Sequence, residues 1–336
     1  MRISVVIPTF NRARLIRSTI PALVGQQVGP GVTYEVIFVD NGSSDDTRSV
    51  LAEAERAAPE VLRHRSIAPT GGPSAPRNVG IRAADGDAIV ILDDDVLPDP
   101  GLVQAYAEFH RAHPEPHHAA VGEAYVPEDL LADPMSLFHA FPYDSVRNLD
   151  RLRYLHFWTC NVSVKRQFML EKGMFDERFL YNEDMICGHR LEEGGMHLHF
   201  LPAARGQHLH QMTPAGLEAK GIFTGRWIHA TCQYLPDPEL KRKFGVIDPS
   251  IGWSLVARRL ANRAGFRLID NPLTRAALRA LGATDGRRSR VSDLYYYIIF
   301  RRSVVAGYAQ ARREAKAGLA PLIADETSGW VNRGDV

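Results

Sequence analysis

The chain has 336 residues, 45% hydrophobic and 24% charged, with a formal net charge of +1, which excludes long disordered stretches and allows one large domain with an appendage or two domains. Three widely spaced cysteines, Cys160, Cys187 and Cys232, argue against a disulfide framework or a cysteine zinc site. The sequence starts without a charged and apolar leader, and no apolar run approaches membrane-spanning length, so we expect a cytoplasmic protein.

Short apolar runs alternate with helical patterns through the first hundred residues. The runs that predict buried strands are 3–7, 34–39 and 89–92, a further strand is expected at 61–67, and the helical patterns cover about 13–24, 44–58 and 74–84. This alternation predicts an α/β fold with a mainly parallel, Rossmann-like sheet flanked by helices. Ligands of such sheets bind at the carboxyl ends of the strands, where polar residues follow each run. No Gly-x-Gly-x-x-Gly turn follows the first run, which argues against a dinucleotide cofactor.

Three adjacent carboxylates follow the apolar run 89–92, namely Asp93, Asp94 and Asp95. Like charges this close disfavour joint ionisation unless a cation neutralises them. In an extended segment Asp93 and Asp95 point to the same side, so one divalent cation could be held with room for phosphate oxygens. The alternative is a solvated acidic turn. Pro98 and Pro100 argue against regular structure immediately after the acids.

Beyond the acids the pattern is less regular. A helix is expected at 102–112, a strand at 158–164, a helix at 165–172, a helix from about 184 to 194 and a strand at 197–201. Residues 113–150 are rich in Pro and His and give little signal. Glu183 and Asp184 fall at the amino end of a helix, where the helix dipole favours anions, and they could act only as its cap. His208 and His210 lie just past the last of these strands.

The final third is helical in pattern and basic. Residues 250–316 contain fourteen Lys and Arg against four Asp and Glu, a local balance of +10. This charge indicates an anionic surface or partner and favours a place at the inner face of a membrane, although arginine-rich helices are usually only solvated. The apolar segment Leu294–Phe300 is expected either to pack against the catalytic body or to lie on a membrane surface, and it is a candidate contact for an oligomer.

Five segments, in order, resemble the landmarks of family 2 glycosyltransferases of the GT-A fold. They are VVIPTFNR at 5–12, VDNGSSDDT at 39–47, PRNVGI at 76–81, LDDDVLPDP at 92–100 and FDERFLYNED at 175–184. The resemblance covers about the first two thirds of the chain. It implies a GT-A catalytic domain over 1–215, with a nucleotide-sugar half at about 1–100 and an acceptor half at about 101–215. Residues 216–336 then form a separate, mostly helical region.

The resemblance also implies roles for residues at matching positions. Asp40 falls where an acid accepts a hydrogen bond from the imide of the base, which favours a uracil or thymine nucleotide. Asp93 falls near the ribose and Arg77 near the nucleotide. The full set expected to bind the nucleotide sugar is Pro8, Thr9, Phe10, Asn11, Asp40, Arg77, Asp93 and Asp94.

The same resemblance assigns the chemistry. Asp95 and Asp93 match the Asp-x-Asp motif that holds Mn²⁺ or Mg²⁺, which stabilises the departing diphosphate as a Lewis acid. His208 is a candidate additional ligand, with His210 close enough to compete for that role. Asp184 matches the base of inverting members, and the neighbouring charge of Glu183 increases its affinity for a proton. Trp158 and Asn161 either line the acceptor cleft or belong to the core.

We therefore expect an inverting glycosyltransferase that uses a UDP- or dTDP-linked sugar and a divalent metal in glycan or polysaccharide synthesis. The acceptor could be a saccharide, a lipid-linked glycan or a small molecule, and nucleic acid is not an expected partner. One alternative is a nucleotidyltransferase, which would carry a glycine-rich, lysine-containing signature near the amino terminus that the segment after Pro8 lacks. The other is a non-catalytic module that binds a nucleotide sugar.

Overall fold

The computed structural model describes residues 1–138, 140–149, 151–209 and 212–318. The described chain divides into two compact units. A sheet unit comprises residues 1–127 and 140–209, and a helical unit comprises 128–138 and 212–318. Within these residues, no helix combines the length and the apolar character that crossing a bilayer requires.

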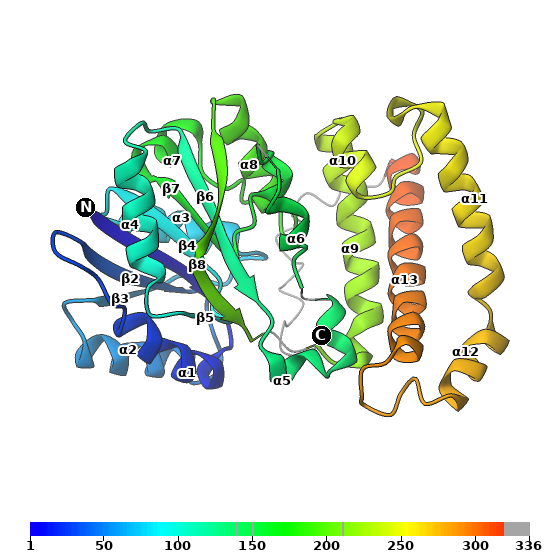
Figure 1. The fold of residues 1–336 in the computed structure, drawn as a ribbon, viewed down its shortest axis with the longest axis horizontal. Helices are drawn as coiled ribbons and strands as arrows, with labels where there is room; N and C mark the ends of the chain where they lie inside the picture. The colour runs from blue at the N-terminus through cyan, green and yellow to red at the C-terminus, as the bar shows by residue number, and fades with distance from the viewer. Residues whose placement is uncertain (139, 150, 210–211, 319–336) are drawn as a thin grey trace. The chain divides into compact units, whose positions relative to one another are not determined.

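An eight-stranded mixed sheet forms the core of the sheet unit (Figure 1). Its strands are β1 (Arg2–Thr9), β2 (Thr33–Asp40), β3 (Leu62–Ser66), β4 (Ala88–Leu92), β5 (Val96–Pro98), β6 (His118–Tyr125), β7 (Asn161–Lys165) and β8 (His197–His208). They are arranged in the order β3-β2-β1-β4-β7-β6-β8-β5. The pairs β1–β2, β2–β3, β1–β4 and β6–β8 are parallel, whereas β7 runs antiparallel to both β4 and β6. The expected mainly parallel sheet flanked by helices is confirmed.

Two reversals of direction, at β4–β7 and β7–β6, leave β6 and β8 running the same way as β1 and β4. The carboxyl ends of β1, β2, β4 and β8 therefore lie at one edge of the sheet. The amino ends of β6 and β8 lie at the opposite edge. This placement decides which side chains of the sheet unit can meet.

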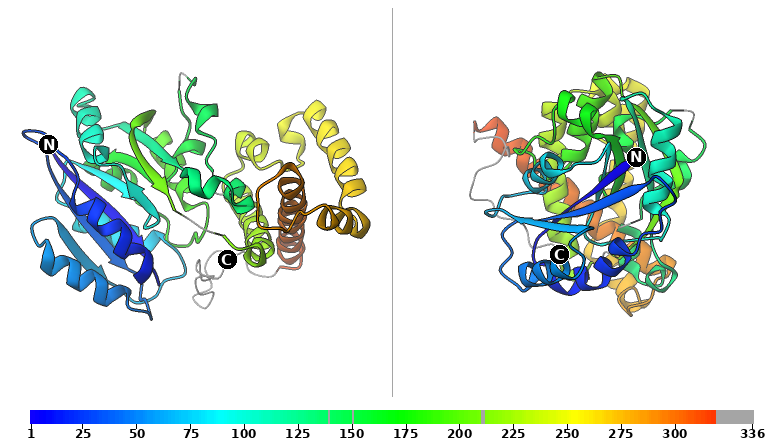
Figure 2. Two further views of the ribbon diagram at one scale, coloured as in Figure 1. Left: turned by 60° about the horizontal axis from the view of Figure 1, so that its bottom comes forward. Right: turned by 90° about the vertical axis from the view of Figure 1, so that its left-hand side faces the viewer.

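Helices cover both faces of the sheet (Figures 1 and 2). The helices of this unit are α1 (Ala13–Val24), α2 (Thr47–Ala57), α3 (Ser74–Ala83), α4 (Leu102–Ala112), α6 (Tyr143–Val146), η2 (Tyr154–His156), α7 (Arg166–Lys172) and α8 (Glu183–Glu193). Val90 and Ser163 are paired across two strands, so their side chains point to the same face of the sheet. The Ser163 hydroxyl contacts His110 of α4, which shows that α4 covers this face. Val6 faces the other way, because a Cβ on Gly80 of α3 would come within 2.4 Å of its side chain.

Three strands differ from the sequence-based expectation. β6 lies in the region that gave little signal. It was not expected, because its HAAVGEAY sequence has small residues where strands usually have bulky β-branched ones. A side chain at Gly122 would meet the carbonyl of Ala204 at 2.1 Å. β5 forms despite Pro98 because it is an edge strand, where a missing N–H is tolerated. β8 extends to His208, which therefore ends the strand rather than following it.

The helical unit is built around two long helices that approach closely. Its helices are α5 (Glu128–Leu131), η1 (Pro134–Phe138), α9 (Pro214–Tyr234), α10 (Pro238–Lys243), η3 (Pro249–Ile251), α11 (Trp253–Ile269), α12 (Pro272–Ala280) and α13 (Arg290–Lys316). A Cβ on Gly225 of α9 would lie 2.0 Å from the carbonyl of Val304, and one on Gly307 of α13 equally close to that of Ile222. These glycines permit backbone contact between α9 and α13.

The apolar segment Leu294–Phe300 belongs to α13 and lies mostly inside the helical unit. Its residues Tyr295, Tyr296, Ile298 and Ile299 are buried and pack in one cluster with Leu217 of α9. The expectation of a membrane-surface helix at this segment is therefore wrong, because the apolar side chains satisfy one another within the unit.

Candidate active site

The carboxyl ends of β1, β2 and β4 carry the polar segments singled out in the sequence. Thr9 ends β1, Asp40 ends β2, and Asp93 directly follows β4. His208 reaches the same edge from β8, because β8 is parallel to these strands. The β8 end is also held in place by β5, where Val96 pairs with His208.

The segment after β1 is fixed against the segment after β2. Asn11 adopts a left-handed backbone with φ of 51°, and its side-chain Oδ1 accepts a hydrogen bond from the Ser44 N–H at 2.8 Å. Its own N–H donates to Ser43 Oγ at 2.9 Å. Pro8 is buried and Phe10 half-buried beside this contact. The two segments thus form one rigid wall of the site.

Asp40 is fully buried at the end of β2. Its Oδ1 accepts from the Ser43 N–H at 3.0 Å, and its Oδ2 accepts from Arg48 Nε at 3.2 Å. The Arg48 side chain is 56% exposed, so the buried carboxylate is paired with a cation at the surface. Sequence reasoning did not identify Ser43 or Arg48 in this role, although Ser43 stands inside the recognised motif.

Asp94 points back toward β1. Its Oδ2 accepts a hydrogen bond from Thr9 Oγ1 at 2.7 Å, and Arg12 Nε lies 3.9 Å from its Oδ1. Burial raises the pKa of Asp94 to about 6, with the charges of Asp95 and Asp93 adding to the rise against the opposing effect of Arg12. Asp94 therefore braces the acidic loop against β1.

Arg77 connects the two acidic motifs. This side chain of α3 is almost fully buried, and its Nη2 donates to Asp93 Oδ1 at 2.9 Å while its Nη1 donates to Glu183 Oε1. Burial alone would lower the pKa of Arg77, but the charges of Glu183 and Asp93 outweigh that and raise it. The arginine is thus a permanent buried cation between β4 and α8.

Asp184 follows Glu183 in the first turn of α8 and is half-buried, with its Oδ1 accepting from the Met185 N–H at 2.7 Å. The thiol of buried Cys160 is influenced by carboxylates of the segment after β4 and of the first turn of α8. Its thiol pKa is raised by burial first and then by the charges of Asp93, Asp95 and Asp184. The charges of both acidic motifs therefore act on the same buried thiol.

The acidic edge has the donor set that a hard divalent cation requires. Asp95 and His208 are both buried, and His208 Nε2 lies 3.5 Å from Asp95 Oδ1. Cis ligands of one ion, each about 2.1 Å from it, are separated by roughly 3 Å, so this pair fits a shared metal. Asp93 has one oxygen committed to Arg77. His210, the other candidate, lies outside the described residues.

The two acceptor candidates are buried. Asn161 accepts from Tyr106 Oη at 2.8 Å and donates to the Ala204 carbonyl at 2.9 Å, so its amide joins α4, β7 and β8. Trp158 packs among aromatic rings, with the centroids of Phe141 and Tyr143 at 5.1 and 5.3 Å. Both side chains support the wall of the site from within the core.

Asn78 is a supporting residue that sequence reasoning did not single out. Its amide donates to the Phe175 carbonyl and accepts from the Phe175 N–H, both at 2.9 Å. Phe175 in turn lies under the Arg77 guanidinium, 5.3 Å from ring centroid to Cζ. The adjacency of Asn78 to Arg77 in the sequence was the available signal.

Comparisons with known proteins found similar chains among glycosyltransferases. The validoxylamine A glucosyltransferase of Streptomyces hygroscopicus subsp. limoneus is 31% identical over 228 residues, which cover 58% of this chain and 48% of that protein. The chain spans about half the length of the curated relatives it matches. Two solved structures are similar in fold.

The first is the mannosyltransferase PcManGT from Pyrobaculum calidifontis in complex with GDP-Man and Mn²⁺, with a TM-score of 0.63, 18% identity, and coverage of 92% of this chain and 87% of that one. The second is S. aureus TarS 1–349 in complex with UDP-GlcNAc, with a TM-score of 0.52, 17% identity, and coverage of 95% and 92%. The sheet unit therefore has the GT-A fold of these glycosyltransferases. The model of glycosyl transferase family 2 matches residues 4–172, and the chain belongs to that family.

Proposed function

We propose that this protein is an inverting glycosyltransferase that moves a sugar from a nucleoside-diphosphate sugar to a hydroxyl acceptor in glycan synthesis. The observation that carries the proposal is the buried Arg77 bridge from Asp93 to Glu183. It ties the first acid of a metal-binding type of motif to Glu183, the residue that directly precedes the candidate base Asp184. A site with only one of these parts could bind a nucleotide without catalysing transfer.

The donor is assigned to the wall formed by the ends of β1 and β2. Asp40 offers a carboxylate to the imide N–H of a uracil or thymine base, in competition with Arg48. Asn11 keeps its segment in place through Ser43 and Ser44, so the wall needs little ordering when the nucleotide binds. A UDP- or dTDP-linked sugar is the expected donor.

Asp95 and His208 would hold a divalent cation, with Asp93 as the third candidate, and the charge of the ion would stabilise the diphosphate leaving group. Arg77 donates a hydrogen bond to Oδ1 of Asp93, and this contact fixes the orientation of the carboxylate and therefore of its second oxygen. Oxygen and imidazole ligands together suit Mn²⁺ or Mg²⁺.

Asp184 is the proposed general base. Its Oδ1 is engaged by the backbone of its own helix, and this contact orients the carboxylate that takes the proton from the attacking hydroxyl. Attack on the face opposite the leaving group inverts the anomeric centre. The charge of Glu183 is balanced by Arg77, so Glu183 acts mainly by positioning and influences its neighbour less than the sequence suggested.

The donor assignment is tested by melting the protein with UDP-, dTDP- and GDP-linked sugars, each with and without Mn²⁺. A ligand that binds only the folded state raises the melting temperature. We expect a rise with a uridine or thymidine nucleotide sugar that depends on Mn²⁺, and slow release of the nucleoside diphosphate from that donor. Binding without any release, even in the presence of candidate acceptors, would favour the non-catalytic alternative.

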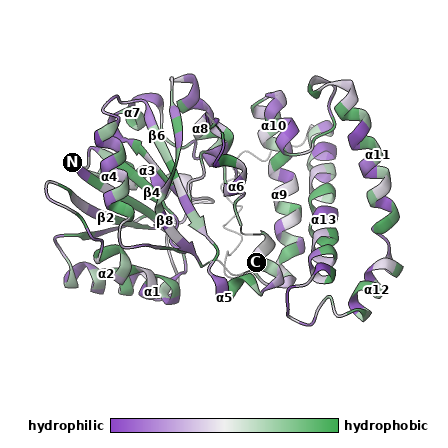
Figure 3. Cartoon of the chain, viewed as in Figure 1, coloured by the Kyte–Doolittle hydropathy of each residue, from purple (hydrophilic) through white to green (hydrophobic). Residues whose placement is uncertain are grey.

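We further propose that α11 gives the protein a peripheral contact with an anionic membrane surface. One stripe of this helix consists of exposed residues at helical spacing: Trp253, Ala257, Leu260, Ala261, Ala264 and Leu268. Trp253 is 73% and Leu268 78% exposed. Arg258, Arg263 and Arg267 are exposed on the same helix, which contains no acid. Figure 3 shows hydrophobic and hydrophilic residues mixed along α11.

Apolar side chains among arginines suit the interface of an anionic bilayer, where the rings and methyl groups enter and the guanidinium groups reach phosphates. We expect the protein to sediment with phosphatidylglycerol vesicles and to remain in solution with phosphatidylcholine vesicles. Replacing both Arg263 and Arg267 with Glu should abolish sedimentation, whereas Arg287→Glu, outside the helix, should weaken it only slightly. Equal binding by all variants would refute the assignment to α11.

A further inference from the structure

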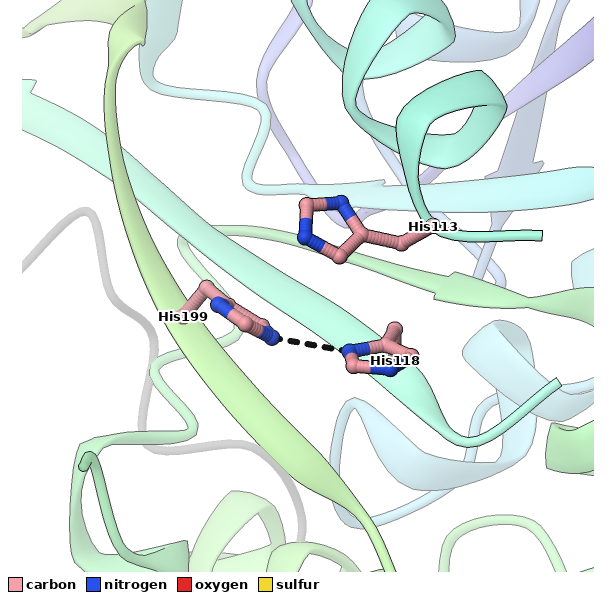
Figure 4. Close-up of side chains that lie close together, drawn as sticks. All are labelled: His113, His118 and His199. Carbon is pink, nitrogen blue, oxygen red and sulfur yellow. Dashed lines mark hydrogen bonds between the residues drawn. The ribbon is translucent and has the colours of Figure 1, made fainter. Parts of the chain in front are cut away.

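A cluster of histidines lies at the edge of the sheet opposite the acidic site. His113 follows the last turn of α4, His118 begins β6, and His199 lies near the start of β8 (Figure 4). One ligand atom from each lies within 4.8 Å of those of the other two. The parallel pairing of β6 with β8 brings His118 and His199 together across 81 residues of sequence.

The spacing of the three rings suits a tetrahedral ion. Their centroids are separated by 4.9 Å (His113 to His118), 4.9 Å (His113 to His199) and 5.1 Å (His118 to His199). A tetrahedral ion with metal–nitrogen bonds of about 2.1 Å places the centres of its imidazole ligands about 5 Å apart. The nearest pair of nitrogens, His118 Nδ1 and His199 Nε2, is 2.9 Å apart and would open to roughly 3.3 Å around such an ion.

The outer nitrogen of His113 has a hydrogen-bond partner of the kind that metal-bound histidines have, and the outer nitrogen of His118 faces a carboxylate at a longer distance. His113 Nδ1 donates to the Phe109 carbonyl at 3.0 Å, which leaves Nε2 with the lone pair. His118 Nε2 lies 3.6 Å from the Glu115 carboxylate, which leaves Nδ1 directed toward His199. A carbonyl or carboxylate behind the ring fixes the tautomer and increases the basicity of the ligating nitrogen.

His199 and the nearby His197 also line a cavity of about 490 Å³.

We propose that His113, His118 and His199 form a binding site for a transition-metal ion of the Zn²⁺ type, separate from the acidic site. Three imidazoles favour Zn²⁺ over Mg²⁺ or Mn²⁺, which prefer oxygen ligands. The ion ties the carboxyl end of α4 to the amino ends of β6 and β8, and its fourth position is left to water. A second set, His117, His118 and His197, shares His118, but His197 is exposed, so the first set is the better cage.

The test is titration of Zn²⁺, in competition with a chromophoric chelator, into the full chain after removal of bound metal. Every protein carries Asp95→Asn, so that the acidic site contributes as little as possible. We expect one Zn²⁺ per chain, bound at least tenfold more weakly after His113→Asn or His199→Gln. His64→Gln, at a histidine of β3 paired with Glu55, is the matched control and should leave the affinity unchanged.

The same zinc affinity in the Asp95→Asn protein and in its His113→Asn, His199→Gln and His64→Gln derivatives would overturn the proposal. Anomalous diffraction at the zinc edge from crystals of the unsubstituted protein gives a second readout that does not depend on the folding of any variant. A peak between the three rings supports the site. The absence of a peak there, at a Zn²⁺ concentration that fills another site on the protein, refutes it.

Discussion

The two polar clusters of the sheet unit lie at opposite edges of the same sheet and handle charge in opposite ways. The acidic site gathers carboxylates from β4 and α8 around one buried cation, Arg77. The histidine cluster contains His118 and His199, whose pKa values are lowered by burial and by neighbouring histidines. One cluster is therefore organised by permanent charge, and the other remains neutral until a proton or a metal arrives.

This difference indicates how each cluster should respond to change. Removing a permanent charge leaves buried carboxylates uncompensated under all conditions near neutral pH. Removing a neutral ring changes stability mainly when pH falls far enough to protonate it.

The largest effect on stability is expected from Arg77→Met. The change leaves the carboxylates of Glu183 and Asp93, whose side chains are 8% and 18% exposed, without their cation. We expect unfolding in urea, without added metal at pH 7, to show a loss of about 3–5 kcal/mol. Arg17→Met is the matched control, because Arg17 is 57% exposed and pairs with Glu53, which is 68% exposed. It should cost less than about 1 kcal/mol. Equal losses in the two variants would contradict the proposed role of Arg77.

His110 gives the corresponding test at the other edge. This ring of α4 contacts Ser163 Oγ at 2.6 Å, and burial, followed by the charges of Lys165, His113 and His118, lowers its pKa to about 3. The unfolded chain, with an ordinary histidine pKa near 6.5, binds the proton more readily, so the stabilisation is present above pH 6.5 and is lost as pH falls toward 3.

Between pH 7 and 5, the free energy of unfolding should therefore fall by about 2 kcal/mol more in the unsubstituted protein than in His110→Gln. Urea denaturation at the two pH values measures this difference. Parallel pH profiles for the two proteins would mean that His110 does not resist protonation.

A smaller effect is expected from Asn78→Ala, which removes an uncharged support of the acidic site. The Phe175 N–H and carbonyl lose their partner, at a cost of about 1–2 kcal/mol in the free energy of unfolding. Gln167→Ala removes an exposed amide that contacts Glu171 on the same helix and should cost less than about 0.5 kcal/mol. A neutral result for Asn78→Ala would show that α3 does not clamp the segment before α8.

The sequence predicted those parts of the fold and site that depend on neighbouring residues. The parallel strands β1, β2 and β4 are apolar runs that end in polar segments, so both these strands and the edge that collects Asp40 and Asp93 could be predicted. The assignments of individual residues to donor, metal and base remain predictions.

Contacts across long separations could not be read from the sequence. Arg77 and Glu183 stand 106 residues apart, and nothing local to either indicates that they pair. The histidine cluster depends on β6, whose small residues do not have the pattern of a strand, and on its register with β8. The contact between α9 and α13 depends on glycines, which in a helical pattern indicate weakness rather than close packing.

The central claim is that Asp95 and Asp184 act on one substrate, the first on the diphosphate side and the second on the incoming hydroxyl. The most direct measurement compares Asp95→Asn and Asp184→Asn in donor binding and in transfer. We predict that Asp184→Asn binds the donor with Mn²⁺ as tightly as the unsubstituted protein but transfers sugar about 10²–10⁴-fold more slowly, while Asp95→Asn loses the Mn²⁺-dependent part of binding. Transfer by Asp184→Asn at the unsubstituted rate would contradict the account.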